Sequence, residues 1–174
     1  MTGLKLRLLA AASVALCLSA GMVRAEDGYD LWLRYRPVET AALPAYRSHA
    51  TAIVAAGSSP TIAAAVSELK RGRSGLLAKD LTTGQLSDGA VLIGTPASSE
   101  TIKGLNLPLA KAGDEGFIIR TTTVGGHNIT VIAGNTDVGV LYGAFRYLSL
   151  IETRKSTDAL DIADAPKLKV RVLD

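Results

Sequence analysis

The sequence has little of the chemistry from which reaction centres are built. Its 174 residues include one cysteine, one tryptophan and two histidines, and only eight residues are aromatic. Because the single cysteine, Cys17, lies in an N-terminal apolar segment that we expect to be removed, the rest of the chain can form neither a disulfide nor a thiolate metal site. The scarcity of aromatic residues leaves little material for a surface that stacks on sugar rings.

A surplus of charge of either sign is also lacking once the N-terminal segment is set aside. The whole chain has 19 Lys and Arg against 16 Asp and Glu. Three of the basic residues, Lys5, Arg7 and Arg24, lie within residues 1–25, where there is no acidic residue. The remaining 16 basic and 16 acidic residues balance, so net charge gives no reason to expect nucleic-acid binding.

Residues 1–25 have the pattern of a secretory signal peptide, in which basic residues precede an apolar run, here residues 8–23. The run is short and rich in alanine for a membrane span, which needs about 20 residues, and Leu16 before the cysteine argues against lipid attachment. We expect cleavage after Ala25, with an uncleaved anchor as the alternative. Export to the periplasm or the cell exterior without a stable membrane anchor follows, and residues 26–174 then form one domain of ordinary size.

Apolar and β-branched runs alternate with helical patterns in this domain. Extended segments are predicted at residues 28–38, 50–57, 90–94, 115–124, 127–134 and 167–174. A helix is predicted to start at Ser59-Pro60 and to end at Gly72, and a short helix is expected within residues 95–104. The Gly125-Gly126 pair predicts a β-hairpin. This order predicts an α/β (α+β) sandwich, a mixed sheet with helices packed on it.

The stretch Gly134–Glu152 joins a polar turn to an apolar helix and raises the question of a ligand loop. A glycine-containing turn before a helix is where phosphates and dinucleotides often bind. The spacing of a dinucleotide fingerprint is missing, no Lys-Ser/Thr pair follows Gly139, and the acidic Asp137 would repel a phosphate. We interpret the turn as a helix start capped by Asp137 and predict no cofactor site.

The other polar residues do not converge on a site. His49 and His127 are far apart in sequence and have no partner at the spacing of a metal site or a catalytic triad. The acidic pairs at 26–27 and 114–115 are adjacent residues in predicted loops, whereas glycosidases hold two carboxylates about 5–10 Å apart across the substrate. The basic run at 70–73 is interpreted as a solvated helix end. We predict no catalytic residue and no metal site.

The helix predicted within residues 138–152 has more apolar surface than one sheet can cover. At 100° per residue its apolar side chains spread over an arc of roughly 220°. Packing on a sheet accounts for about half of that arc, so we expect a second buried face against another domain. The residues expected to make this interdomain contact are Val140, Tyr147, Ile151 and the two glycines of a smooth strip, Gly139 and Gly143.

Three motifs in order resemble one known family. "EDGYDLWLRY" follows the export signal, "GFIIRT" enters the hairpin, and "GVLYGAFRYLSLIE" precedes a proline and "RVLD". Together they resemble the N-terminal domain of the secreted or periplasmic α-glucuronidases of glycoside hydrolase family 67, and the resemblance covers nearly all of residues 26–174. A weaker likeness, to the small α/β domain before the barrel of β-hexosaminidases, is an analogy of fold.

The resemblance implies an accessory domain. In that family the domain precedes a (β/α)8 barrel that carries the catalytic acid and base and removes 4-O-methylglucuronic acid from xylo-oligosaccharides with inversion and without a metal. No position in this sequence matches those carboxylates. We therefore expect a non-catalytic domain whose partner is a barrel absent from these 174 residues, with xylan-derived oligosaccharides bound through that barrel. Ser149 departs from the basic or larger residue expected in relatives.

Two other interpretations were weighed against this one. A free-standing carbohydrate-binding module would present exposed aromatic rings, and Trp32 is the one candidate for such a sugar contact, although a core or interface position suits it better. A complete small hydrolase would need a converging acid, base or nucleophile, which the sequence does not offer. Whether the short chain is a functional product or a gene fragment stays open at this point.

Overall fold

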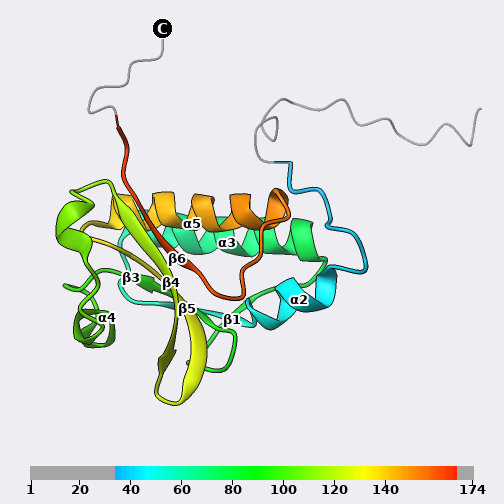
Figure 1. Cartoon of the computed structure of the whole chain (residues 1–174), viewed down its shortest axis with the longest axis horizontal. Coiled ribbons are helices and arrows are strands. Elements are labelled where there is room, and N and C mark those ends of the chain that lie inside the picture. The colour runs from blue at the N-terminus through cyan, green and yellow to red at the C-terminus, as the bar shows by residue number, and fades with distance from the viewer. Residues whose placement is uncertain (1–33, 168–174) are drawn as a thin grey trace, which may run out of the picture. The chain divides into compact units, whose positions relative to one another are not determined.

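A six-stranded sheet forms the centre of the fold (Figure 1). The structure, a computed structural model, describes residues 34–167. Contacts divide the chain into Met1–Arg34 and Tyr35–Asp174, and every element named below lies in the second unit. The helices are α2 (Leu43–Ser48), α3 (Pro60–Leu77), α4 (Glu100–Gly104), the 3₁₀ helix η1 (Leu109–Lys111) and α5 (Asp137–Glu152). The strands are β1 (Ala52–Ala55), β2 (Thr82–Thr83), β3 (Val91–Gly94), β4 (Phe117–Val124), β5 (His127–Gly134) and β6 (Asp161–Asp164).

The sheet is mixed, with the strand order β2-β1-β3-β5-β4-β6. Strand β1 pairs parallel with β2 and β3, and β3 pairs parallel with β5. Strand β4 pairs antiparallel with both β5 and β6. Parallel neighbours need a long crossover connection, and α3 provides one between β1 and β2. The predicted α/β (α+β) architecture, a mixed sheet with helices packed on it, is confirmed.

The predicted hairpin joins β4 to β5. Val124 pairs with His127 at its end. The two residues between them, Gly125 and Gly126, both have positive φ, at 58° and 84°. Two-residue turns with positive φ at both positions match the twist of paired strands, and glycine adopts that backbone without strain. The Gly-Gly signal in the sequence therefore identified this turn correctly.

Helices cover both faces of the sheet, because alternate residues of each strand point to opposite sides. Helices α3 and α5 lie side by side on one face, and α4 lies on the other (Figure 1). The core under α3 and α5 includes Ile53, Val91, Ile93, Ile119 and Ile132. The core under α4 and η1 includes Leu92, Ile102, Leu109, Ile118 and Val131.

Helix α3 is longer than the sequence predicts. It continues through Gly72 and ends at Leu77, where Ala78 takes a left-handed backbone with φ 47°. A Cβ added to Gly72 would lie 2.6 Å from Cδ1 of Leu148 in α5. Gly72 thus lets two helices approach each other closely, which is a packing role that a glycine within a helical pattern can have and that the sequence pattern did not separate from a helix end.

The ends of the chain limit what the structure tests. The predicted signal peptide, its boundary at Ala25 and the candidate sugar contact Trp32 lie outside the described residues. Of the extended segment predicted at 28–38, the described part from Arg34 onward forms no strand, and most of the segment predicted at 167–174 lies outside the described residues. Within residues 34–167 no helix has the length and apolar character that crossing a membrane requires.

Candidate contact surface on helix α5

The turn before α5 is filled by the protein's own polar groups. Thr136 is the N-cap of α5, and its side chain accepts a hydrogen bond from the backbone N–H of Gly139. Asp137 takes the first helical position, where its Oδ2 accepts a hydrogen bond from Ser59 Oγ at 2.6 Å. Ser59 is itself the N-cap of α3. The cap is thus Thr136 and not Asp137 as predicted, and the Asp137 carboxylate occupies the place beside two helix N-termini that an anion would favour.

The residues predicted to contact another domain are covered by this chain. Val140 is 0% exposed, Ile151 1% and Tyr147 2%, and Gly139 and Gly143 are also buried. Side chains enclosed by their own domain offer no surface to a second one. The apolar arc of α5 is real, but these five residues are its inner part and not an interface.

Helix α3 supplies the second buried face that the sequence assigned to another domain. The core beneath both helices contains residues of α3 and α5 together. The glycine strip faces the sheet: a Cβ on Gly139 would lie 2.3 Å from the carbonyl oxygen of Gly116, and one on Gly143 would lie 2.5 Å from Cγ2 of Ile132. The backbone that approaches the strip is therefore that of the segment entering β4, in the same domain.

The part of α5 that remains open is an apolar stripe on its outer side, which we name the outer-face stripe: Val138, Leu141, Tyr142 and Phe145. Val138 is 38% exposed and Phe145 37%, whereas Leu141 and Tyr142 are half-buried. At 100° per residue these four side chains span roughly 100° of the helix circumference. Single exposed apolar residues are common, but a continuous stripe on one helix face is a candidate contact surface.

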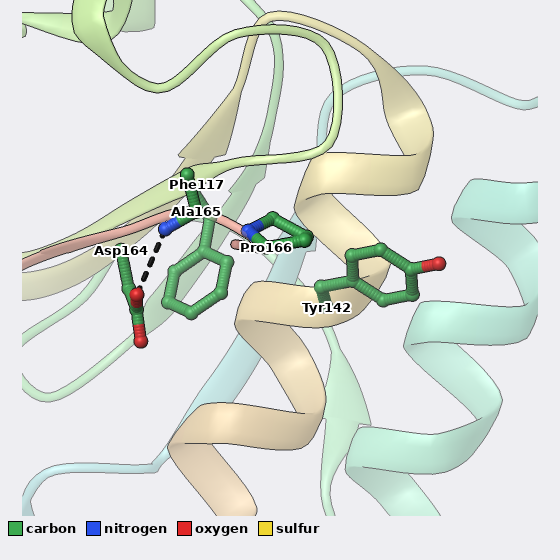
Figure 2. Close-up of a pocket in the computed structure, with 5 residues that line it drawn as sticks. All are labelled: Phe117, Tyr142, Asp164, Ala165 and Pro166. Atoms are coloured by element: carbon green, nitrogen blue, oxygen red, sulfur yellow. Dashed lines mark hydrogen bonds between the residues drawn. The ribbon is translucent and has the colours of Figure 1, made fainter. Parts of the chain in front are cut away.

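An open hollow of about 440 Å³ adjoins the stripe, and its lining residues are Phe117, Tyr142, Asp164, Ala165 and Pro166 (Figure 2). Phe117 begins β4, Tyr142 belongs to α5, and the other three form the end of β6 and the chain that follows it. Asp164 Oδ1 accepts a hydrogen bond from Ala165 N at 2.8 Å. In the view of Figure 2, Pro166 lies between the rings of Phe117 and Tyr142.

A second, smaller hollow lies at the same end of β6. It has a volume of about 220 Å³ and is lined by Pro108, Lys111, Ala112, Ala163, Asp164 and Ala165. Asp164 and Ala165 therefore border both hollows. The sequence analysis missed β6 altogether, because its four residues, "DIAD", have only one apolar-to-polar alternation and two acidic residues.

The histidines lie away from both hollows, and each faces one carboxylate. His49 Nε2 lies 3.0 Å from Asp158 Oδ1, and His127 Nδ1 lies 3.8 Å from Asp88 Oδ1. Across residues 34–167 there is no group of three or more His, Cys, Asp or Glu side chains that could hold a metal ion. Asp164 is the only carboxylate that lines either hollow, so neither hollow offers a pair of acids.

One charged side chain is buried where the sequence predicts a solvated run. Arg73 in α3 is 1% exposed, and its Nη2 donates to the carbonyl of Arg47 at 3.4 Å. Its Nε and Nη1 have no hydrogen-bond partner among the residues that the structure describes. Burial lowers the pKa of Arg73, because desolvation penalises the charged form. Arg73 lines neither hollow, so it belongs to the packing of α3 rather than to the contact surface.

The fold and this surface define a small α/β domain with an open apolar stripe and, among its described residues, no paired acids in a hollow. Residues 31–147 match the family described as "Glycosyl hydrolase family 67 N-terminus". The chain belongs to that family.

Relatives with names point the same way. The chain is 33% identical over 148 residues to "Probable alpha-glucuronidase A" of Aspergillus niger, covering 80% of this chain and 16% of that protein. It is 33% identical over 150 residues to "Alpha-glucuronidase A" of Aspergillus tubingensis, covering 81% and 17%. The chain thus spans about a sixth of the length of these curated relatives.

Among solved structures, a family GH115 4-O-methyl-α-glucuronidase with specificity for decorated arabinogalactans has a TM-score of 0.48 and 18% identity to this chain. The superposition covers 60% of this chain and 14% of that one.

Proposed function

We propose that this chain provides a non-catalytic N-terminal domain to an exported α-glucuronidase-like enzyme that removes 4-O-methylglucuronic acid from xylo-oligosaccharides. The observation that carries the proposal is the match of residues 31–147 to the N-terminus of glycoside hydrolase family 67. The relatives are named α-glucuronidases, and a region of this kind makes up only 16–17% of them. The catalytic (β/α)8 barrel and its oligosaccharide site are assigned to the remainder of such an enzyme.

The chemistry of the described residues supports a non-catalytic role. Glycoside hydrolysis uses two carboxylates on opposite sides of the scissile bond. The hollow beside α5 has one carboxylate, that of Asp164, and a backbone N–H already occupies its Oδ1. The two His–Asp pairs lie outside the hollows. These groups suit surface structure better than acid–base catalysis.

An activity assay tests the non-catalytic part of the proposal. The purified 174-residue protein, incubated with aldouronic acids, is expected to release no glucuronic acid above the blank. The α-glucuronidase of Aspergillus tubingensis serves as the positive control under the same conditions. Turnover by the 174-residue protein that copurifies with it through two chromatography steps would contradict this part of the proposal.

A chimera tests the accessory role itself. The whole chain replaces the matching N-terminal region of the Aspergillus tubingensis enzyme, and an enzyme from which that region is deleted is the control. The chimera is expected to be soluble and active on aldouronic acids, and the deletion control to lose solubility or activity. A soluble, folded chimera without activity would count against the accessory role, as would a deletion control with full activity.

The alternative of a free-standing carbohydrate-binding module has its own test. In affinity gel electrophoresis the 174-residue protein and the variant Trp32→Ala are expected to migrate equally with and without xylan. Retardation by xylan that disappears in Trp32→Ala would favour the binding-module interpretation instead.

A further inference from the structure

We propose that the outer-face stripe of α5 and the hollow at the end of β6 form one docking surface for the domain that follows this region in α-glucuronidases. The inference rests on the proposed function, since the partner is the downstream domain of such an enzyme. It replaces the predicted interface of Val140, Tyr147 and Ile151 with residues that the structure leaves open.

The stripe and the hollow are continuous because they share Tyr142. This residue lines the hollow together with Phe117 and Pro166, and it lies one helical turn from both Val138 and Phe145. Val138 and Phe145 are the large apolar side chains with the greatest exposure, 38% and 37%, among the described residues. An apolar strip that runs from a helix face into a concave surface is the shape that a protruding apolar group of a partner can fill.

The course of the chain identifies the partner. Strand β6 ends at Asp164, and the next two residues, Ala165 and Pro166, are part of the wall of the hollow. In the relatives more than four-fifths of the polypeptide lies outside the region that matches this chain. A domain connected after Pro166 starts at the hollow, and a covalent connection gives it a high effective concentration there. A modest apolar area is then enough to hold it in place.

The rim of the hollow adds a polar requirement. Asp164 is exposed and is the only carboxylate in the lining. Contacts between domains of one chain combine an apolar centre with a polar rim. The partner surface is therefore expected to bring an apolar or aromatic side chain against Tyr142 and Phe145, and a hydrogen-bond donor, such as Lys or Arg, near Asp164.

Hydroxyl-radical footprinting of the chimera described above tests the docking. The rates of oxidation of Phe145 and Tyr142 are measured in the chimera and in the 174-residue protein alone. Both are expected to be several-fold lower in the chimera. Leu105, at the end of α4 on the opposite face of the sheet, is the internal control and is expected to react equally in the two proteins. Equal rates at Phe145 and Tyr142 in a folded chimera would overturn the docking proposal.

Two variants of the chimera sharpen the test. Phe145→Lys is expected to restore the oxidation rate of Tyr142 to that of the 174-residue protein and to lower the melting temperature of the chimera. Thr101→Lys, an equally charged change at an exposed position of α4, is expected to change neither. Unchanged protection of Tyr142 in Phe145→Lys would contradict the assignment of this surface.

The outcomes separate the two proposals. An active chimera without protection of the stripe leaves the proposed function standing and removes the docking surface. A folded but inactive chimera contradicts the proposed function, while its footprint still decides the docking. An insoluble chimera counts against both. Protection of Phe145 that grows with the concentration of the 174-residue protein alone would assign the surface to a second copy and overturn the proposal.

Discussion

At the scale of single residues, buried polar groups gather where the residues around α2 meet α3 and α5. The Tyr147 hydroxyl donates to the carbonyl of His49 at 2.9 Å, and Arg73 Nη2 donates to the carbonyl of Arg47. Burial raises the pKa of Tyr147 and lowers that of Arg73, since each stays neutral more readily away from water. With no hollow beside them, these groups couple pH to folding stability rather than to catalysis.

Replacing Tyr147 with phenylalanine tests this coupling. At neutral pH the variant is expected to lose about 1 kcal/mol of unfolding free energy, because the His49 carbonyl loses its partner. At alkaline pH the order of loss reverses. An unfolded tyrosine titrates near pH 10, whereas the pKa of the native Tyr147 is higher. The native state then holds the proton longer, so its stability falls as pH rises above about 10, by up to about 1.4 kcal/mol per unit for this group.

Urea unfolding at neutral pH and above pH 10 measures both effects. The wild-type protein is expected to lose more stability on the alkaline side than Tyr147→Phe does, because the variant has one proton fewer to release. The half-buried Tyr142, changed to phenylalanine, provides a matched control for the loss of one tyrosine. Equal alkaline losses in the wild type and in Tyr147→Phe would show that the buried hydroxyl does not titrate as described.

At the scale of elements, glycine sets how closely α5 lies on the segment that enters β4. A Cβ on Gly139 would lie 2.3 Å from the carbonyl oxygen of Gly116, a backbone atom that cannot rotate away. The substitution Gly139→Ala is therefore expected to cost about 2 kcal/mol or more. Gly104 in α4 is the control, since a Cβ there meets nothing within 4 Å, and Gly104→Ala is expected to be neutral or to stabilise by up to about 1 kcal/mol. Chemical denaturation measures both, and equal effects would contradict the close approach.

The same elements show how far the sequence could predict the structure. The Gly125-Gly126 hairpin and the start of α3 at Ser59-Pro60 depend on local chemistry, and both were predicted. The role of Gly72 could not be, because it depends on Leu148, which is distant in sequence and close only after α3 and α5 have packed. For the same reason the apolar arc of α5 was read correctly as needing two partners, while the second partner, α3, was assigned to another domain.

The candidate contact surface was predictable only in part. A helical wheel places Val138 and Phe145 on α5 opposite Val140 and Ile151, but it does not say which side the sheet covers. The hollow depends on β6, whose short acidic sequence carries no strand signal. The position of Asp164 beside Phe117 results from the register of β6 on β4, in which these two residues pair, and register over four residues is set by the rest of the fold.

At the scale of the whole molecule, the domain closes its own core and leaves one apolar stripe open. The residues of α5 that face the sheet and α3 are almost fully buried without any contribution from a second domain. The chain nevertheless corresponds to about a sixth of the relatives it matches. Folding stability and attachment to a larger enzyme are thus assigned to opposite sides of the same helix, which makes them separable by mutation.

Two valines of α5 provide the matched pair for this separation. Val140 is 0% exposed and Val138 is 38% exposed, and the two lie two residues apart in one helix. In the isolated 174-residue protein, Val140→Ala is expected to lower the unfolding free energy by about 2 kcal/mol, because two buried methyl groups are lost and a cavity remains. Val138→Ala is expected to change it by no more than about 0.5 kcal/mol. Guanidinium unfolding of both variants measures the difference. A large loss in Val138→Ala would mean that the outer side of α5 is already covered within the isolated chain, and the stripe would then be unavailable to any partner.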